Sequence, residues 1–309
     1  MKILVTGGAG YVGCALIPLL LEKGHSVRVL DSLIHGGRGL LPLFSHRKFE
    51  FLRGDIRDRE KLKESLGGID IIIHLAAIVG YPACKKSPQL AEDINFHGTV
   101  LLERTRDHRV PIIFASTGSN YGAIIGEICK EETLLSPLTI YGKTKTDAEN
   151  HLMHSKNTIC MRFATAFGIS NRLRLDLLIN DFVYQAKKIR NLIIYEKSFR
   201  RTFIHVRDMA RAFMFAVDHY EKVKDDVYNV GSEKMNLSKE EVAMLIRKKI
   251  DFYLHFADVG KDEDQRNYEV CYDKISTAGY TTTISVEEGI DELIKAMDVI
   301  DISNEFSNV

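Results

Sequence analysis

The chain has 309 residues, of which 45% are hydrophobic, and it carries 42 basic and 42 acidic side chains. This length predicts about two domains, and the ordinary apolar fraction excludes a chain that is disordered throughout. Zero net charge argues against a general nucleic-acid binder. Residues 162–211 alone, however, hold 11 basic and 4 acidic side chains. This positive segment indicates either an anionic small-molecule partner or a set of surface ion pairs.

The cysteines and the apolar runs indicate the compartment. The five cysteines are odd in number and far apart, so they cannot form a fully paired disulfide framework: Cys14, Cys84, Cys129, Cys160 and Cys271. No apolar run approaches the ~20 residues that cross a bilayer, and the N-terminal one is too short for a signal peptide. We therefore expect a cytoplasmic protein without a membrane partner. His151 and His154 lack a third ligand, so no metal site is predicted.

Strand and helix patterns alternate through the first half of the chain. A strand at 2–6 meets a glycine cluster and a helix at 11–23, and further strands are expected at 26–31, 49–54, 70–75 and 111–116, with a helix at 93–106. Continuously apolar strands separated by helices predict a parallel sheet that is covered on both faces. The expected fold is α/β, a Rossmann-type doubly wound parallel sheet.

This alternation weakens after residue 165. Helices are expected at 175–190, 207–218, 238–249 and 286–297, and strands at 192–195, 202–206 and 227–231. No flexible linker separates the two halves. We therefore expect interleaved domains: a larger one from 1–165 plus about 198–232, and a smaller C-terminal one from about 166–197 and 233–309.

Three glycines between the first strand and the first helix predict a dinucleotide site. Gly7 permits the tight turn, Gly10 allows close approach of a pyrophosphate, and Gly13 allows the helix to pack on the strand. The helix N-terminus supplies amide groups to the phosphates. Asp31 ends the second strand, where a carboxylate can accept hydrogen bonds from ribose hydroxyls and repel a 2′-phosphate. The site is therefore predicted to prefer NAD to NADP.

Tyr141 and Lys145 stand four residues apart, which places them on one face of a helix. A cation there can help to lower the phenol pKa from about 10, so that the tyrosine removes a hydroxyl proton while hydride leaves the same carbon. The same spacing recurs at Tyr81/Lys85, Tyr184/Lys188 and Tyr220/Lys224. Only Tyr141 follows a strand that ends in a hydroxyl cluster, Ser116–Ser119, which selects this pair.

These motifs together resemble the extended short-chain dehydrogenase/reductases of the NAD-dependent nucleotide-sugar epimerase/dehydratase family, over nearly the whole chain. Further matching segments are 54–56, 74–77, Asn95 with 98–99, 121–122 and 201–206. The resemblance implies that Thr117 binds the sugar hydroxyl, Tyr141 is the base and Lys145 holds the nicotinamide ribose. It implies these cofactor-binding residues: Gly7, Gly10, Tyr11, Val12, Gly13, Asp31, Asp55, Ile56, Leu75, Ala76, Ala77, Asn95, Ser116, Tyr141 and Lys145.

The resemblance also narrows the reaction. Gly118 and Ser119 stand where a 4,6-dehydratase of the family carries Asp-Glu, which disfavours dehydration. A 4-epimerase-type reaction is the leading expectation. The second half, at 169–182, 199–206 and 262–268, resembles capsular-heptose GDP-dehydrogenases, so net oxidation of a GDP-sugar is the alternative. A non-catalytic NAD-binding module is a third hypothesis, against which the intact Thr-Tyr-Lys set argues.

Arginines in the second half are the candidates for an anionic substrate, a nucleotide-diphosphate sugar linked to GDP or UDP. Arginine matches phosphate geometry with parallel donors. By family position, Arg201 and Arg266 are the best diphosphate candidates, Arg172 and Arg174 are weaker ones that equally suit surface ion pairs, and Asn180 assists. The resemblance further implies a homodimer.

Overall fold

A computed structural model describes residues 1–260, 265–300 and 308. Its centre is a seven-stranded sheet in the order β11-β7-β5-β4-β1-β2-β3, and every neighbouring pair in it is parallel. The strands are β1 (Lys2–Thr6), β2 (Ser26–Asp31), β3 (Phe49–Arg53), β4 (Ile71–His74), β5 (Ile112–Thr117), β7 (Thr158–Phe163) and β11 (Asp226–Val230). The predicted doubly wound parallel sheet is confirmed.

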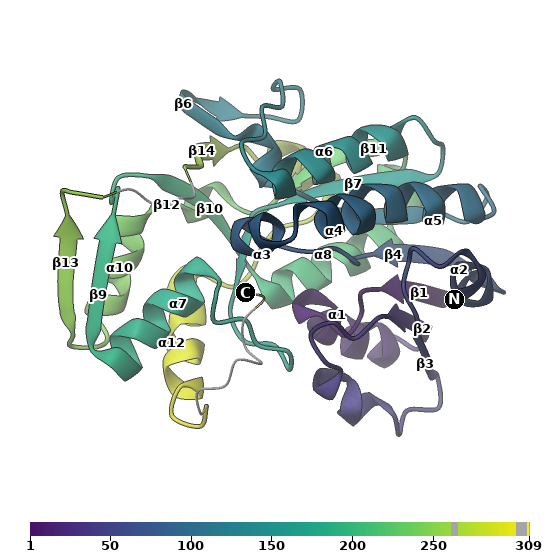
Figure 1. The fold of residues 1–309 in the computed structure, drawn as a ribbon, viewed down its shortest axis with the longest axis horizontal. Helices are drawn as coiled ribbons and strands as arrows, with labels where there is room; N and C mark the ends of the chain where they lie inside the picture. The colour runs from purple at the N-terminus through teal and green to yellow at the C-terminus, as the bar shows by residue number, and fades with distance from the viewer. Residues whose placement is uncertain (261–264, 301–307, 309) are drawn as a thin grey trace.

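Helices cover both faces of this sheet (Figure 1). Alternate side chains of β1 point to opposite faces: Ile3 and Val5 join the core beneath α1 (Tyr11–Glu22) and α8 (Val206–Asp218). Leu4 joins the core beneath α2 (Arg59–Leu66), α5 (Thr99–Thr105) and α6 (Ile140–Met153). Burial on both faces explains why the strands are apolar without alternation.

Two helices differ in the structure from those that the sequence pattern predicts. The helix expected at 93–106 is instead α4 (Pro88–Glu92), a π-helical turn (Asp93–Gly98) and α5. The helix expected at 175–190 begins later, as α7 (Leu178–Tyr184), and ends in a second π-helical turn (Gln185–Ile189). Such turns shift the side chains that follow, and hydrophobic periodicity does not reveal them.

A second, smaller region stands beside the main sheet (Figure 1). It contains α7, α10 (Lys239–Arg247), α12 (Val286–Ala296), and the parallel pair β9 (Asn191–Tyr195) and β13 (Tyr253–Ala257). Its own core includes Ile179, Val183, Val242, Ile290 and Leu293. A small sheet, β12 (Asn236–Ser238), β10 (Arg200–His205) and β8 (Thr165–Phe167), connects this region to the rest of the chain.

One pairing in the fold was not expected from the sequence. β6 (Ala123–Cys129), which follows the hydroxyl cluster, pairs in parallel with β14 (Asn267–Val270), far along the chain. The remaining helices are short: α3 (Tyr81–Lys86), α9 (Tyr220–Val223), α11 (Asp273–Ala278) and the 3-10 turns Arg38–Leu43, Gly118–Tyr121 and Glu233–Met235. The β6–β14 pair carries the residues just before β14 to the carboxyl end of β5.

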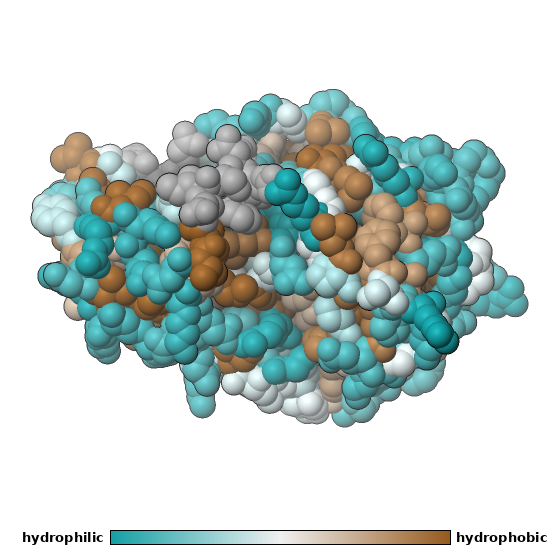
Figure 2. All heavy atoms as spheres, turned by 90° about the horizontal axis from the view of Figure 1, so that it is seen from below, coloured by the Kyte–Doolittle hydropathy of each residue, from teal (hydrophilic) through white to brown (hydrophobic). Residues whose placement is uncertain are grey.

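Seen from below, hydrophobic residues on the surface form separate patches between hydrophilic ones (Figure 2). Within residues 1–260 and 265–300, no helix combines the length and the apolar character that a membrane span requires.

Candidate active site

A deep cleft opens at the carboxyl ends of β1, β2, β4 and β5, which is where ligands bind in open α/β sheets. Most of the residues predicted for the site line it: Gly7, Gly10, Tyr11, Val12, Gly13, Asp31, Asp55, Ile56, Leu75, Ala76, Ala77, Ser116, Thr117, Tyr141, Lys145, Arg172, Arg174 and Arg266. The cleft therefore brings the glycine loop and the Tyr-Lys pair into one space.

The glycine loop fits a dinucleotide because side chains are excluded where the backbone must turn or pack. Gly7 has a φ of +71°, and a Cβ there would lie 2.6 Å from the Ala76 nitrogen. A Cβ on Gly13 would lie 2.3 Å from the Gly8 carbonyl oxygen. These contacts leave backbone amides and the start of α1 facing the cleft, which is the arrangement that a pyrophosphate requires.

Two carboxylates, Asp31 and Asp55, line the cleft at the ends of β2 and β3. Asp31 accepts hydrogen bonds from the Ala9 and Leu33 amides at 2.9 and 2.8 Å, and burial raises its pKa above the ordinary value. Asp55 accepts from the Arg57 guanidinium through both oxygens, at 3.0 and 2.7 Å, and this hydrogen bonding lowers its pKa. Both carboxylates are held in place, and lone pairs remain for ribose or base donors.

The helix α6 presents the Tyr-Lys pair to the cleft. Thr139 caps its N-terminus by accepting a hydrogen bond from the Gly142 amide at 3.0 Å. One turn apart, Tyr141 and Lys145 both line the cleft. The Lys145 Nζ lies 3.8 Å from the centre of the Phe114 ring, and only 2% of the residue is exposed. The ring and the helix therefore fix the amine.

Burial controls the pKa values of this pair. It raises the pKa of Tyr141 to about 12, against the opposing charges of Arg174 and Arg266 and a hydrogen bond with Thr117. It lowers the pKa of Lys145 to about 7. Burial therefore dominates both values, while the charges of Arg174 and Arg266 favour the Tyr141 phenolate. That Lys145 also lowers the phenol pKa stays a prediction.

A hydroxyl chain continues from Tyr141 to the opposite wall. Thr117 donates to the Ser119 Oγ at 3.1 Å and accepts from the Ser119 amide at 3.1 Å. Arg266 in turn donates to the Ser119 Oγ. The β6–β14 pairing therefore places a guanidinium two hydrogen bonds from the catalytic threonine candidate.

Three predicted residues do not line the cleft within the described parts of the chain. The Asn95 amide bonds both the Ile78 backbone, at 2.7 and 3.0 Å, and the Thr144 hydroxyl, so it ties a cleft loop to α6. The Asn180 side chain bonds Gly168 and the Arg174 carbonyl. Arg201 is 2% exposed in β10. The asparagines therefore position neighbouring segments of the backbone.

Several lining residues were not anticipated. They lie in the loop after β2, in the loop after β4 and at the start of β14: Ser32, Ile34, His35, Val79, Gly80 and Tyr268. The rule that ligands bind beyond the carboxyl ends of strands points to the first two loops. No local pattern reveals Tyr268, because only the β6–β14 pairing brings it there.

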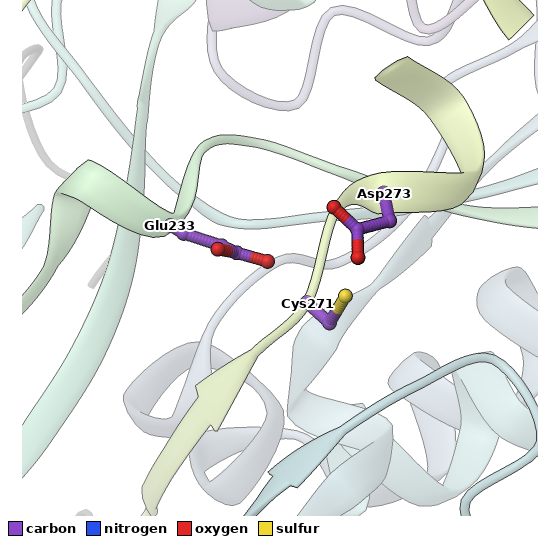
Figure 3. Close-up of side chains that lie close together, drawn as sticks. All are labelled: Glu233, Cys271 and Asp273. Carbon is purple, nitrogen blue, oxygen red and sulfur yellow. The ribbon is translucent and has the colours of Figure 1, made fainter. Parts of the chain in front are cut away.

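Another cluster lies away from the cleft. The side chains of Glu233, Cys271 and Asp273 converge (Figure 3), with one potential ligand atom from each within 4.8 Å of the others. Burial raises the pKa of the Cys271 thiol to about 11, and metals bind the thiolate. We assign no metal to this cluster.

The fold and the glycine loop together define a dinucleotide-dependent enzyme. Residues 3–231 match the model of the NAD dependent epimerase/dehydratase family. The chain belongs to that family, and its cofactor is NAD.

Relatives match over most of their length. A putative UDP-glucose 4-epimerase of Methanocaldococcus jannaschii is 28% identical over 96% of this chain and 98% of that protein. The UDP-glucose 4-epimerase of Halalkalibacterium halodurans is 30% identical over 80% of each. The crystal structure of UDP-glucuronic acid 4-epimerase from Bacillus cereus superimposes with a TM-score of 0.85, at 26% identity, over 97% of this chain and 99% of that one.

Proposed function

We propose that the protein is a nucleotide-sugar 4-epimerase. The observation that carries this proposal is the convergence of Thr117, Tyr141 and Lys145 in the cleft that the glycine loop opens. Bound NAD supplies a nicotinamide ring that accepts and returns hydride. Tyr141 takes the proton of the sugar C4 hydroxyl, Thr117 holds that oxygen, and Lys145 holds the nicotinamide ribose.

The distribution of carboxylates supports epimerisation over 4,6-dehydration. Elimination of water needs an acid and a base near the sugar. Of the described residues that line the cleft, only Asp31 and Asp55 are carboxylates. Asp31 ends β2 and Asp55 follows β3, at the end of the cleft proposed for adenosine. Ser119, in the position expected for an acid, bonds Thr117 and Arg266 instead.

The names of the matched proteins support a UDP-linked sugar as the substrate. The GDP-linked sugar expected from the sequence is the second candidate. We propose that the region from about 166–197 and 233–309 binds this substrate, with Arg266 on its diphosphate, because Arg266 lines the cleft and arginine stays charged and offers paired donors. Arg201, the other expected diphosphate ligand, is 2% exposed in β10 and does not line the cleft within the described residues, so it is not assigned to the substrate.

The test mixes purified protein and NAD with UDP-glucose, UDP-galactose, their uronic acids and GDP-linked sugars. An epimerase forms a sugar isomer without net NADH. Accumulating NADH contradicts epimerisation and favours net oxidation. Tyr141→Phe abolishes turnover while NAD binding persists. Tyr220→Phe is the matched control, since this tyrosine also precedes a lysine by four residues but bonds Asn157 away from the cleft.

A further inference from the structure

Ser119 lies in the 3-10 turn Gly118–Tyr121, directly after β5, and stands between the Thr117 hydroxyl and the Arg266 guanidinium. It lines the cleft and is only 2% exposed. Its backbone packs against α6, because a Cβ on Gly142 would lie 3.0 Å from the Ser119 carbonyl oxygen. Its amide donates to the Thr117 hydroxyl at 3.1 Å. The backbone therefore holds the Ser119 side chain beside Thr117.

The Ser119 hydroxyl accepts hydrogen bonds from both neighbours. Arg266 can only donate, because a guanidinium has no acceptor, and it donates to the Ser119 Oγ. Thr117 also donates to that oxygen, at 3.1 Å. Both lone pairs of the Ser119 oxygen are thus filled, while its own proton has no acceptor among the residues that the structure describes. The hydroxyl can therefore still turn its proton toward Thr117.

The direction of the hydrogen bond from Thr117 to Ser119 is incompatible with the proposed reaction. A threonine hydroxyl has one proton, and here that proton faces Ser119. In the reaction the sugar C4 oxygen gives its proton to Tyr141 and becomes a carbonyl oxygen, which accepts hydrogen bonds and donates none. Thr117 can hold that oxygen only if its proton turns from Ser119 into the cleft.

Two hydroxyl rotations reverse the chain without breaking an O–H bond. Thr117 then donates to the sugar oxygen, and Ser119 donates to Thr117. Arg266 still donates to Ser119, and a guanidinium has further donors for the proposed diphosphate. All three hydrogen bonds now run away from the guanidinium, and bonds that run in one direction polarise one another. Through Ser119, the charge of Arg266 acts on the oxygen that loses its proton.

We propose that Ser119 is a positioning residue, whose hydroxyl changes from acceptor to donor and so frees the Thr117 proton for the sugar oxygen. The proposal deepens the proposed function and rests on it, because it requires Thr117 on that oxygen. It also gives a role to the serine that stands where a 4,6-dehydratase of the family carries an acid.

The first measurement needs no substrate. In the NAD-loaded protein, the Tyr141 phenolate replaces the sugar oxygen as the acceptor from Thr117. Hydrogen bonds to a charged oxygen are stronger than those between neutral groups, so loss of the Ser119 hydroxyl weakens the phenolate state more than the phenol state. Ser119→Ala is therefore expected to raise the pKa of Tyr141. Titration of the phenolate absorbance, with that of Tyr141→Phe subtracted, measures the change.

The other titratable or charged groups beside Tyr141 stay the same in this variant: Cys84, Lys145, Arg174 and Arg266. A change in the pKa of Tyr141 therefore reports on the hydroxyl chain. Ser155→Ala is the matched control, since the Ser155 hydroxyl donates to Glu103 and does not line the cleft. This control is expected to leave the pKa of Tyr141 and the turnover unchanged.

The second measurement follows epimerisation of the UDP-sugar that the parent converts. Ser119→Ala is expected to lower kcat at least about tenfold, as for loss of one hydrogen bond to a charged group. KM should change by less than about threefold, because the substrate contacts remain. Ser119→Thr keeps the hydroxyl and should retain kcat within about threefold of the parent. Combined with Arg266→Gln, the loss in kcat should be smaller than the product of the two single losses, since groups that act as one unit are not additive.

Three results would overturn the proposal. An unchanged pKa of Tyr141 in Ser119→Ala, or an unchanged kcat, would show that the hydroxyl does not act on the reacting oxygen. A loss of kcat that Ser119→Thr fails to restore would make Ser119 a packing residue. If the parent converts no nucleotide sugar, the epimerase proposal fails by itself, and the phenolate titration still decides whether Ser119 acts on Tyr141 through Thr117.

Discussion

The Arg162 Nη2 lies 2.6 Å from the Glu149 Oε1, in an ion pair whose side chains are 6% and 2% exposed. Glu149 stands one turn beyond Lys145 on α6, and Arg162 lies on β7. The same carboxylate accepts from the Ser116 hydroxyl at 2.5 Å, next to Thr117 in β5. One buried acid therefore joins the reactive helix to the two strands behind the site.

Glu149→Ala is expected to lower the free energy of unfolding by about 3–5 kcal/mol, because Arg162 would remain charged, buried and without this partner. Urea denaturation followed by circular dichroism measures the change. Lys63→Ala, which breaks an exposed ion pair with Glu60 on α2, should cost less than about 1 kcal/mol. Equal losses of unfolding free energy in the two variants would show that the buried ion pair stabilises the fold no more than the exposed one.

Lys145→Met should stabilise the fold in a pH-dependent way. Burial lowers the pKa of Lys145 from 10.5 to about 7, so the folded state binds fewer protons than the unfolded state between these values. The resulting loss of folding stability is absent above pH 10.5, grows as the pH falls, and is complete below about pH 7. At pH 7, the free energy of unfolding of the variant should therefore exceed that of the parent by a few kcal/mol, on the order expected for a pKa shift of this size.

Unfolding curves of Lys145→Met and parent, collected between pH 6.5 and about 10, test this prediction. The difference in stability should shrink as the pH rises. Lys143→Met, at an exposed neighbouring position on α6, should show no such trend. A stability difference that stays constant with pH would contradict a neutral buried amine.

Gly168→Ala should lower the free energy of unfolding far more than Gly36→Ala. Both glycines have positive φ, +104° and +77°, but a Cβ on Gly168 would lie 2.2 Å from the His205 Nε2, whereas nothing lies within 4 Å of one on Gly36. The Gly36 variant should lose only the roughly 1–2 kcal/mol that a left-handed backbone conformation costs a residue with a Cβ. The Gly168 variant should lose more than about 3 kcal/mol in urea denaturation. Similar losses would mean that His205 moves aside at little cost.

Asp31→Asn should narrow the preference for NAD over NADP. The carboxylate lines the cleft at the end of β2, where its charge is expected to repel a 2′-phosphate. The dissociation constant of NADP is expected to fall and that of NAD to rise. Titration of both cofactors into parent and variant measures the ratio. Asp58→Asn serves as the control, because Asp58 is an exposed carboxylate that caps α2 and asparagine caps helices equally well. An unchanged ratio in the Asp31 variant would remove Asp31 from cofactor selection.

The sequence by itself determined the parallel sheet, the glycine loop and the choice of Tyr141 with Lys145. These features are local: apolar strand runs, a strand–glycine–helix junction and a one-turn spacing depend on residues close together in the chain. The α6 helix and the cleft contain the pair as the pattern indicated. For the same reason the family resemblance could be drawn from short motifs.

Only the tertiary structure decided what depends on contacts between distant segments. The β6–β14 pairing brings Arg266 to Ser119 across 147 residues of chain, and the irregular segment 168–176 carries Arg172 and Arg174 into the cleft. The π-helical turn at 93–98 keeps the Asn95 side chain hydrogen-bonded to Ile78 and Thr144. The pKa order of Tyr141 and Lys145 also depends on burial, and burial is a property of the packed fold that no spacing along the chain encodes.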